Sequence, residues 1–401
     1  MTIRSEPVQY PFPPAPSLYQ PTTTLTELRE DQPVVKIEFP DGRSGWLVTR
    51  YADVRQVLVD PRFSRAEALG PEVASPGLGT LAGESILGMD PPEHTRLRKL
   101  VMRAFTARRI ERLRPSVAAM VDQLLDEMAT LPQPADLVEH FALPLPVNVI
   151  CELLGVPASD RHTFHAWSDT LMGDMNRDQG EMRVALEHLA GYLAALIAEK
   201  RAAPADDLMT ALIAARDEQD RLSERELVIL CVSILIAGHE TTANQINMFL
   251  LTLLHHPEQL DKLRSDPASI PSAIEELMRF TQLGDAGAGI PRVTTAEVEL
   301  SGVTIPAGAV VFPAMLSANR DPRMFDDPDR LDLSRGEVQH LGFGAGIHHC
   351  LGAQLARMEL QESLGGLLRR MPNIRVAVPD DQLRFKPGML LRSLESLPVT
   401  W

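Results

Sequence analysis

The sequence predicts a mainly helical fold with a minor β region. Its 401 residues are 44% hydrophobic but only 5% aromatic, so the core must consist largely of Leu, Ala, Val and Ile, which suits helix packing. One apolar, helix-forming stretch runs from Ser223 to His256 without a proline. At about 1.5 Å per residue this helix would be roughly 50 Å long. Because no segment resembles a flexible linker, we expect a single domain over residues 1–401.

Charge and cysteine usage limit the classes of function. The net charge of -15 argues against a nucleic-acid partner and favours a soluble protein. We expect no membrane-spanning segment, because no apolar run approaches the roughly 20 residues that span a bilayer, and residues 1–20 are polar and rich in proline. Cys151, Cys231 and Cys350 are far apart and odd in number, which is typical of a reducing compartment. We therefore expect a cytoplasmic protein without a membrane anchor.

The first quarter of the chain contains short elements. Residues 1–25 hold six prolines and are expected to lie extended. Two strand-like runs, 34–39 and 45–48, flank a Pro-Asp-Gly turn and predict a hairpin. Residues 52–59 have helical spacing, whereas residues 65–89 have no sustained period. This last segment predicts a long loop of the kind that often carries function.

A basic segment follows. His94 and Arg98 are four residues apart, so on a helix they share one face and could reach the same anionic group. From Arg96 to Arg114 there are eight Lys or Arg residues and one Glu, a local charge of +7. A solvated helix face is one interpretation of such a run. The alternative is a docking surface for an acidic electron carrier, formed by Arg103, Arg108, Arg109 and Arg112.

Residues 116–220 are mostly amphipathic helix, with a break at residues 173–180. The clearest helical runs are 117–128, 147–154, 160–172 and 181–200. Cys151 lies in an apolar helical run, where a cysteine usually serves as a small buried hydrophobe.

The long central helix has polar residues at its middle. It opens with Ser223-x-x-Glu226, the pattern of a capping box. Gly238 would let a flat ligand approach the backbone, and the Thr241 hydroxyl can bond to the carbonyl four residues earlier, which bends a helix locally. A groove there could hold dioxygen. Glu240 is notable because an unpaired carboxylate in an apolar helix is costly.

Between the long helix and the C-terminal region, a short helix over residues 271–280 places Glu276 and Arg279 on one face. After it, Arg292 begins a strand, and the runs 298–300, 303–305 and 310–312 predict a small sheet.

The segment from Phe343 to Gly352 presents a cysteine on a loop that contains two glycines, Gly344 and Gly346. Glycine at both positions indicates a bulged loop. A helix is expected from Leu351 to Leu360, and its N-terminal dipole would stabilise a Cys350 thiolate. Such a sulfur could be an axial ligand of haem iron. A buried structural cysteine and half of a zinc site are alternatives, although no further pair of zinc ligands lies nearby. A dinucleotide fingerprint fails, because His349 stands where its third glycine should be.

The pattern Phe-Gly-x-Gly-x-His-x-Cys-x-Gly resembles the haem-binding loop of the cytochrome P-450 superfamily. Three further motifs occur in the same order as in that family: His94-x-x-x-Arg98, Ala-Gly-His-Glu-Thr at residues 237–241, and Glu276-x-x-Arg279. The resemblance implies haem b held between the long central helix and the cysteine-bearing helix. It assigns iron ligation to Cys350, proton delivery to Glu240 and Thr241, and further haem contacts to His94, Arg98, Gly238, Arg292, Phe343, His348 and Gly352.

The same resemblance implies structural and substrate-binding roles. Glu276 and Arg279 would join a third basic residue in bracing the haem loop, and Arg330 fits that place. Residues 65–89, the helices on either side of the break at 173–180 and the C-terminal tail would enclose the substrate. The expected contacts are Leu81, Ile86, Leu87, Ile234, Ala237, Ala288, Ile290, Met389 and Leu390.

The function implied is an oxygen-dependent monooxygenase that hydroxylates or epoxidises an organic substrate. The phrases Leu-Leu-Gly-Val-Pro at 153–157 and Ala-Gly-His-Glu-Thr-Thr at 237–242 are similar to those of soluble actinomycete members that tailor polyketides, macrolides and related metabolites. Because the chain has no nucleotide or flavin motif, it would take electrons from a ferredoxin and its NAD(P)H-linked reductase. We expect a monomer. A peroxide-driven peroxygenase and a non-catalytic haem carrier or sensor are the alternatives.

Overall fold

The computed structural model describes two compact units of the chain. The described residues are 6–13, 21–69, 83–172, 179–217, 222–281, 289–386, 391 and 393–401. The sheet unit comprises Met1–Gly79 and His255–Cys350, and the helical unit comprises Thr80–Leu254 and Leu351–Trp401. The expectation of a single domain stays a prediction.

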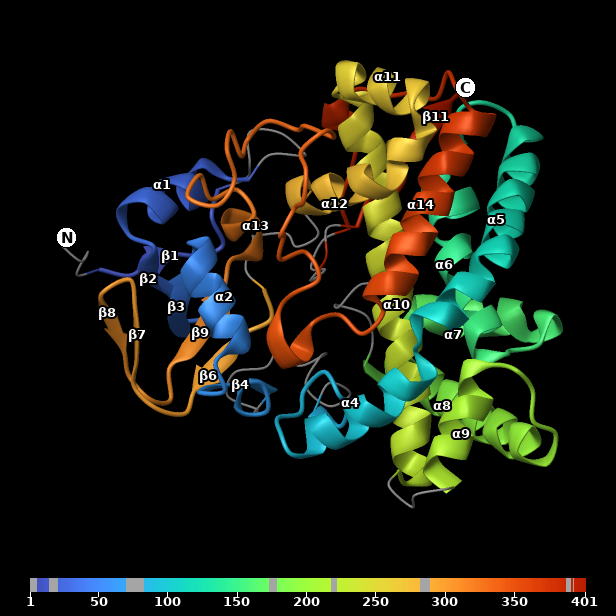
Figure 1. Cartoon of the computed structure of the whole chain (residues 1–401), viewed down its shortest axis with the longest axis horizontal. Helices are drawn as coiled ribbons and strands as arrows, with labels where there is room; N and C mark the ends of the chain where they lie inside the picture. The colour runs from blue at the N-terminus through green and yellow to red at the C-terminus, as the bar shows by residue number, and fades with distance from the viewer. Residues whose placement is uncertain are drawn as a thin grey trace. The chain divides into compact units, whose positions relative to one another are not determined.

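A six-stranded sheet organises the sheet unit (Figure 1). Its strands lie in the order β1-β2-β3-β9-β6-β4, with bounds Val8–Gln9, Val34–Glu38, Ser44–Val48, Val310–Pro313, Arg292–Thr294 and Phe63–Ser64. The predicted hairpin is confirmed, because β2 and β3 pair antiparallel and Gly42 turns the chain with a φ of +83°. Of the three runs expected to form one small sheet, 298–300 and 303–305 pair as β7 (Val298–Leu300) and β8 (Val303–Ile305), whereas 310–312 belongs to β9 of the six-stranded sheet.

Short helices accompany this sheet. They are α1 (Thr23–Asp31), α2 (Tyr51–Val59), α11 (Pro257–Ser265), α12 (Ile270–Phe280) and α13 (Met315–Ala318). The predicted helices at 52–59 and 271–280 are confirmed as α2 and α12. In the N-terminal segment β1 is extended as expected and pairs parallel with β2, whereas residues 23–25 depart from the expectation because α1 begins at Thr23. A core of Val48, Val54, Val57, Phe63 and Val311 joins α2 to the sheet.

The helical unit is built around α10 (Glu224–Leu254), the predicted long central helix. It packs against α6, α8 and α14, and Figure 1 shows α14 lying between α10 and α5. The remaining bounds are α4 (Glu93–Ala104), α5 (Ala107–Ala129), α6 (Pro144–Leu154), α7 (Arg161–Met172), α8 (Gln179–Ala202), α9 (Leu208–Asp217) and α14 (Ala353–Arg370). A three-stranded sheet of β10 (Arg375–Val376), β11 (Pro398–Thr400) and β5 (Ala135–Asp136) completes the unit.

The predicted capping box at the start of α10 is confirmed. The Glu226 amide donates to Ser223 Oγ at 3.1 Å, and the Ser223 amide donates to the Glu226 carboxylate at 2.7 Å. By length and composition α10 could cross a membrane, contrary to the expectation that no segment could. Half of the most apolar 18-residue stretch of α10 is buried inside the protein, and the core helix of a folded domain can have the same length and composition.

Candidate functional site

The cysteine loop of the sheet unit has the bulged conformation that its glycines predict. Gly344 and Gly346 have φ values of +71° and +69°, in the left-handed region that favours glycine. A Cβ on Gly346 would also lie 2.7 Å from the carbonyl oxygen of Leu58, so the loop packs directly on the end of α2. The Cys350 amide donates to the Phe343 carbonyl at 2.8 Å, which closes the loop.

Cys350 itself is exposed, whereas Phe343 is buried. The helix after it, α14, begins at Ala353 with Gly352 as its N-cap, two residues later than the predicted start at Leu351. Cys151 and Cys231 are buried, and burial raises the pKa of each thiol to about 12. An accessible sulfur on a glycine-shaped loop can approach a haem iron as its axial thiolate, so this loop fits the cofactor.

The middle of α10 carries an accessible stripe, after which residues 242–253 of the helix are buried. Ala237 is exposed, and Ile234, Gly238 and Thr241, which share its face, are partly exposed. The Thr241 hydroxyl donates to the Ala237 carbonyl at 2.6 Å, which confirms the predicted bond to the residue four positions earlier. A Cβ on Gly238 would lie 2.5 Å from Cδ1 of Ile150, so α10 packs closely on α6 at this glycine and a larger residue would displace the Ile150 side chain.

Glu240 is 3% exposed and is not an unpaired carboxylate. Ser393 Oγ donates to Glu240 Oε1 at 2.7 Å, and Asn244 Nδ2 donates to Ser393 Oγ at 2.8 Å. These bonds offset the cost of burying the carboxylate. Sequence reasoning missed both partners. Asn244 lies one turn after Glu240, so helical spacing could have predicted that the two side chains are neighbours. No short-range sequence pattern predicts the contact with Ser393, which is 153 positions from Glu240.

The side chains expected to bind anionic groups lie in both units. In the helical unit, His94 and Arg98 lie one turn apart on α4, and His94 is 1% exposed. In the sheet unit, Arg292 at the start of β6 is 3% exposed, and His348 ends a short 3-10 turn in the cysteine loop. Arg292 donates to the carbonyls of Ile290 and Pro291, at 3.1 and 3.2 Å, and these bonds orient the guanidinium.

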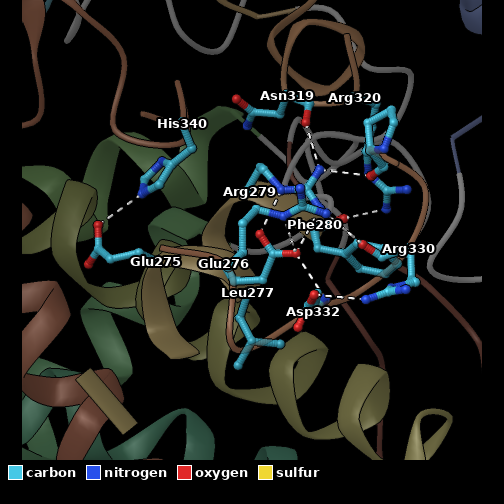
Figure 2. Close-up of polar contacts among 12 residues, drawn as sticks. Glu275, Glu276, Leu277, Arg279, Phe280, Asn319, Arg320, Arg330, Asp332 and His340 are labelled. Carbon is cyan, nitrogen blue, oxygen red and sulfur yellow. Dashed lines mark hydrogen bonds and ion pairs between the residues drawn. The ribbon is translucent and has the colours of Figure 1, made fainter. Parts of the chain in front are cut away.

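Glu276 and Arg279 form the predicted buried pair on α12 (Figure 2). Both side chains are fully buried, and Arg279 donates two hydrogen bonds to the Glu276 carboxylate, at 2.7 and 2.8 Å. Arg279 also donates to the backbone carbonyls of Asn319, Pro328 and Arg330. The pair therefore joins α12 to the segment that precedes the cysteine loop.

The choice of Arg330 as the third member was wrong. Its side chain is 62% exposed and bonds Asp332 at 2.8 Å, so only its backbone carbonyl reaches the buried pair. The third basic residue is Arg335, whose Nε lies 3.3 Å from Glu276 Oε1 and whose side chain is 17% exposed. Arg335 also donates to the carbonyls of Asp326 and Asp327, so its guanidinium joins that segment to Glu276.

Replacing these two arginines should separate their roles. Arg335→Ala removes a charge partner of the buried Glu276 and should lower the free energy of unfolding by about 1–3 kcal/mol. Arg330→Ala removes an exposed ion pair and should cost about 0.5 kcal/mol or less. Urea unfolding followed by circular dichroism measures both. An equal loss in the two variants would contradict the assignment of Arg335.

The basic segment carries less net charge at the surface than its sequence suggests. Arg109 and Arg112 both pair with Asp206, at 3.4 and 3.0 Å, and Arg114 pairs with Glu111 and Glu362. Arg103 and Arg108 are exposed. Beside them a surface groove of about 370 Å³ lies between α5 and α14, lined in part by Arg108, Arg114 and Arg357.

Among the expected substrate contacts, the structure describes five. Ile86, Ile234 and Ile290 are partly buried, Leu87 is 39% exposed, and Ala237 belongs to the accessible stripe of α10. Leu81, Ala288, Met389 and Leu390 lie outside the described residues.

Comparison with known proteins identifies relatives along nearly the whole chain. A family model described as Cytochrome P450 matches residues 147–271 and 269–382. The chain is 47% identical to a mycinamicin IV hydroxylase/epoxidase of Micromonospora griseorubida, over 99% of both chains. It is also 47% identical to a nocardicin C N-oxygenase of Nocardia uniformis, over 93% of this chain and 94% of the relative.

Solved structures match in fold as well. The LnmA cytochrome P450 hydroxylase from the leinamycin biosynthetic pathway of Streptomyces atroolivaceus has a TM-score of 0.91 and 46% identity. That match covers 98% of this chain and all of the other. The mixed-function P450 MycG, in a P21 crystal form, has a TM-score of 0.92 and 47% identity over 99% of this chain and 100% of its own.

Proposed function

Because this chain belongs to the cytochrome P450 family and is a haem-dependent monooxygenase, we propose that Cys350 is the thiolate ligand of its haem b. The observation that carries the proposal is the exposed sulfur on a loop that two left-handed glycines shape and the Cys350 amide closes. Haem b, when bound, supplies the redox chemistry that transfers one oxygen atom from O₂ to a C–H or C=C bond.

The remaining haem contacts follow from charge and position. His94, Arg98, Arg292 and His348 would bind the anionic propionate groups, and the orientation of Arg292 by two carbonyls prepares its guanidinium for that task. Phe343 and Gly352 would pack beside the ring, and Gly238 would let it approach α10.

Glu240 and Thr241 would manage protons. The Thr241 hydroxyl donates its hydrogen bond to the Ala237 carbonyl. The lone pairs of its oxygen can therefore accept a hydrogen bond from a bound group. Glu240 precedes Thr241 in the chain, and its Oε1 accepts a hydrogen bond from Ser393 that holds the carboxylate in place. Proton transfer by a positioned carboxylate typically contributes about 10²–10⁴ in rate.

Removing the anchor of Glu240 should therefore slow turnover without unfolding the protein. Ser393→Ala leaves Glu240 Oε1 buried without this donor, and we expect product formation to fall by about tenfold while the free energy of unfolding falls by only about 1–2 kcal/mol. Ser363→Ala is the matched control, because Ser363 is equally buried in the helical unit and bonds only a backbone carbonyl of α14. Equal activity in the two variants would contradict a role for Glu240.

The substrate is proposed to be a lipophilic metabolite of the polyketide or macrolide class. The relatives named above act on mycinamicin and nocardicin or belong to leinamycin biosynthesis, and the accessible stripe of α10 is apolar except for Thr241. Electrons would come from a ferredoxin and its NAD(P)H-linked reductase, docking at Arg103, Arg108, Arg109 and Arg112. We propose a soluble cytoplasmic monomer.

One experiment tests this function. Purified protein with a ferredoxin, its reductase, NADPH and a panel of macrolides should consume O₂ and release oxygenated product. Turnover with hydrogen peroxide alone would indicate a peroxygenase instead. Haem binding with no turnover by either oxidant would indicate a carrier or sensor.

A further inference from the structure

Glu275 and His340 form a contact beneath the cysteine loop that no part of the proposed reaction uses (Figure 2). Glu275 lies on α12, and His340 stands ten residues before Cys350. We propose that they are a positioning pair, which sets the place of Cys350 and thereby the electronic properties of the haem. This proposal rests on Cys350 being the iron ligand.

The imidazole of His340 bonds at both nitrogens. Its side chain is 3% exposed, Nε2 lies 3.1 Å from Glu275 Oε2, and Nδ1 accepts the Gly342 amide at 3.0 Å. An amide N–H can only donate, so Nδ1 carries no proton and Nε2 must carry it. In this arrangement the ring donates to Glu275 through Nε2 and accepts from the loop backbone through Nδ1.

The loop is held to the rest of its unit immediately before the cysteine turn. A Cβ on Gly342 would lie 2.9 Å from Met278 Cε and 3.1 Å from the Met278 carbonyl oxygen, so the backbone lies against α12. The Leu341 amide donates to Asn319 Oδ1 at 2.7 Å, and the Asn319 carbonyl accepts from Arg279. Residues 340–342 are thus attached to α12 directly and through Asn319.

Beyond Gly342 the loop makes backbone bonds within itself and packs on the end of α2 at Gly346. The Gly344 amide donates to Leu341 and the Cys350 amide donates to Phe343, each at 2.8 Å. The Phe343 ring also contacts the His340 ring, with centroids 5.6 Å apart. Phe343, whose carbonyl accepts the Cys350 amide, follows Gly342 directly. The bond from the Gly342 amide to His340 therefore restricts the position of that carbonyl.

The Glu275 carboxylate does more than attach the His340 ring to α12. A negative charge at Nε2 increases the electron density of the imidazole and strengthens Nδ1 as an acceptor, as carboxylates do for metal-binding histidines. Hence Glu275 acts on the Gly342 bond through the ring. Neither residue needs to touch the sulfur, and both act by restricting where the sulfur lies.

Two substitutions of His340 separate this role from simple stability. His340→Asn places an amide oxygen near the position of Nδ1, which keeps the Gly342 bond and loses Glu275. His340→Gln places its amide near Nε2, which keeps Glu275 and loses the Gly342 bond. Glu275→Ala keeps the ring and removes the charge. Ser301→Ala is the matched control, because Ser301 donates to Asp53 in the same unit, away from the loop.

The test uses the haem-loaded full chain. Carbon monoxide added to the reduced protein gives a strongly red-shifted band when the ligand is a thiolate, and the rate at which this band is lost in mild urea reports how firmly the sulfur is held. We expect His340→Gln, which loses the Gly342 bond, to speed this loss by about five- to tenfold, and Glu275→Ala and His340→Asn, which keep that bond and lose only the carboxylate contact, by about twofold. The haem reduction potential should shift in the same order, and the Gly342 amide should exchange hydrogen faster in His340→Gln. Ser301→Ala should lower the urea midpoint and change none of these.

Equal rates for His340→Asn and His340→Gln would overturn the proposal. So would His340 and Glu275 variants in which the rate of band loss rises only in proportion to the fall in the urea midpoint. A wild-type protein that never shows the band would instead refute Cys350 as the ligand, which is a failure of the proposed function.

Discussion

Cys350→Ala should abolish the red-shifted absorption of the reduced carbon monoxide complex and reduce oxygenation to background. The reason is electronic as well as structural, since only a thiolate donates the electron density that favours O–O cleavage in this family. Absorption spectra before and after reduction, with product analysis by mass spectrometry, measure both effects. The Cys350 loop should otherwise remain intact, because its closing bonds come from the backbone.

The two other cysteines provide matched controls. Cys151 and Cys231 are fully buried, and burial raises the pKa of both thiols, so neither forms a thiolate near neutral pH. Replacing either by alanine should leave the band in place and affect only stability. Loss of the band in one of these variants, with Cys350→Ala unaffected, would refute the assignment.

Arg279→Ala should cause the largest loss of stability among single substitutions in the sheet unit. It leaves the fully buried Glu276 without its bidentate partner and frees the carbonyls of Asn319, Pro328 and Arg330. Breaking a buried ion pair costs about 3–5 kcal/mol, a large share of the roughly 5–15 kcal/mol that holds a typical domain folded. We expect the urea midpoint to fall sharply and haem retention to fall with it.

An exposed ion pair of the same unit is the control. Arg43 and Asp41 pair at 2.7 Å with about half of each side chain exposed, so Arg43→Ala should leave the midpoint nearly unchanged. Arg279→Lys keeps the charge but not the two parallel bonds, and it should recover only part of the lost stability. A midpoint for Arg279→Ala equal to that of Arg43→Ala would show that the buried pair is not a main support of the cysteine loop.

Much of the fold could be predicted because its signals are local. The long helix α10, its capping box, the β2–β3 hairpin and the glycine-shaped loop each depend on residues that are neighbours in the chain. The back-bond of Thr241 is local for the same reason. The pairing of Glu276 with Arg279 needed only three-residue spacing on a helix.

The sequence by itself therefore determined the helices, the hairpin, the cysteine that the family uses and the residue types around it. Tertiary structure decided which distant groups meet them: Arg335 in place of Arg330, Ser393 beside Glu240, Asp206 against two arginines of the basic segment, and His340 on Glu275. Helix and turn signals act over a few residues and can be read from spacing. The partner of a buried charge is chosen by how the backbone folds over long separations, and spacing along the chain carries no record of that choice.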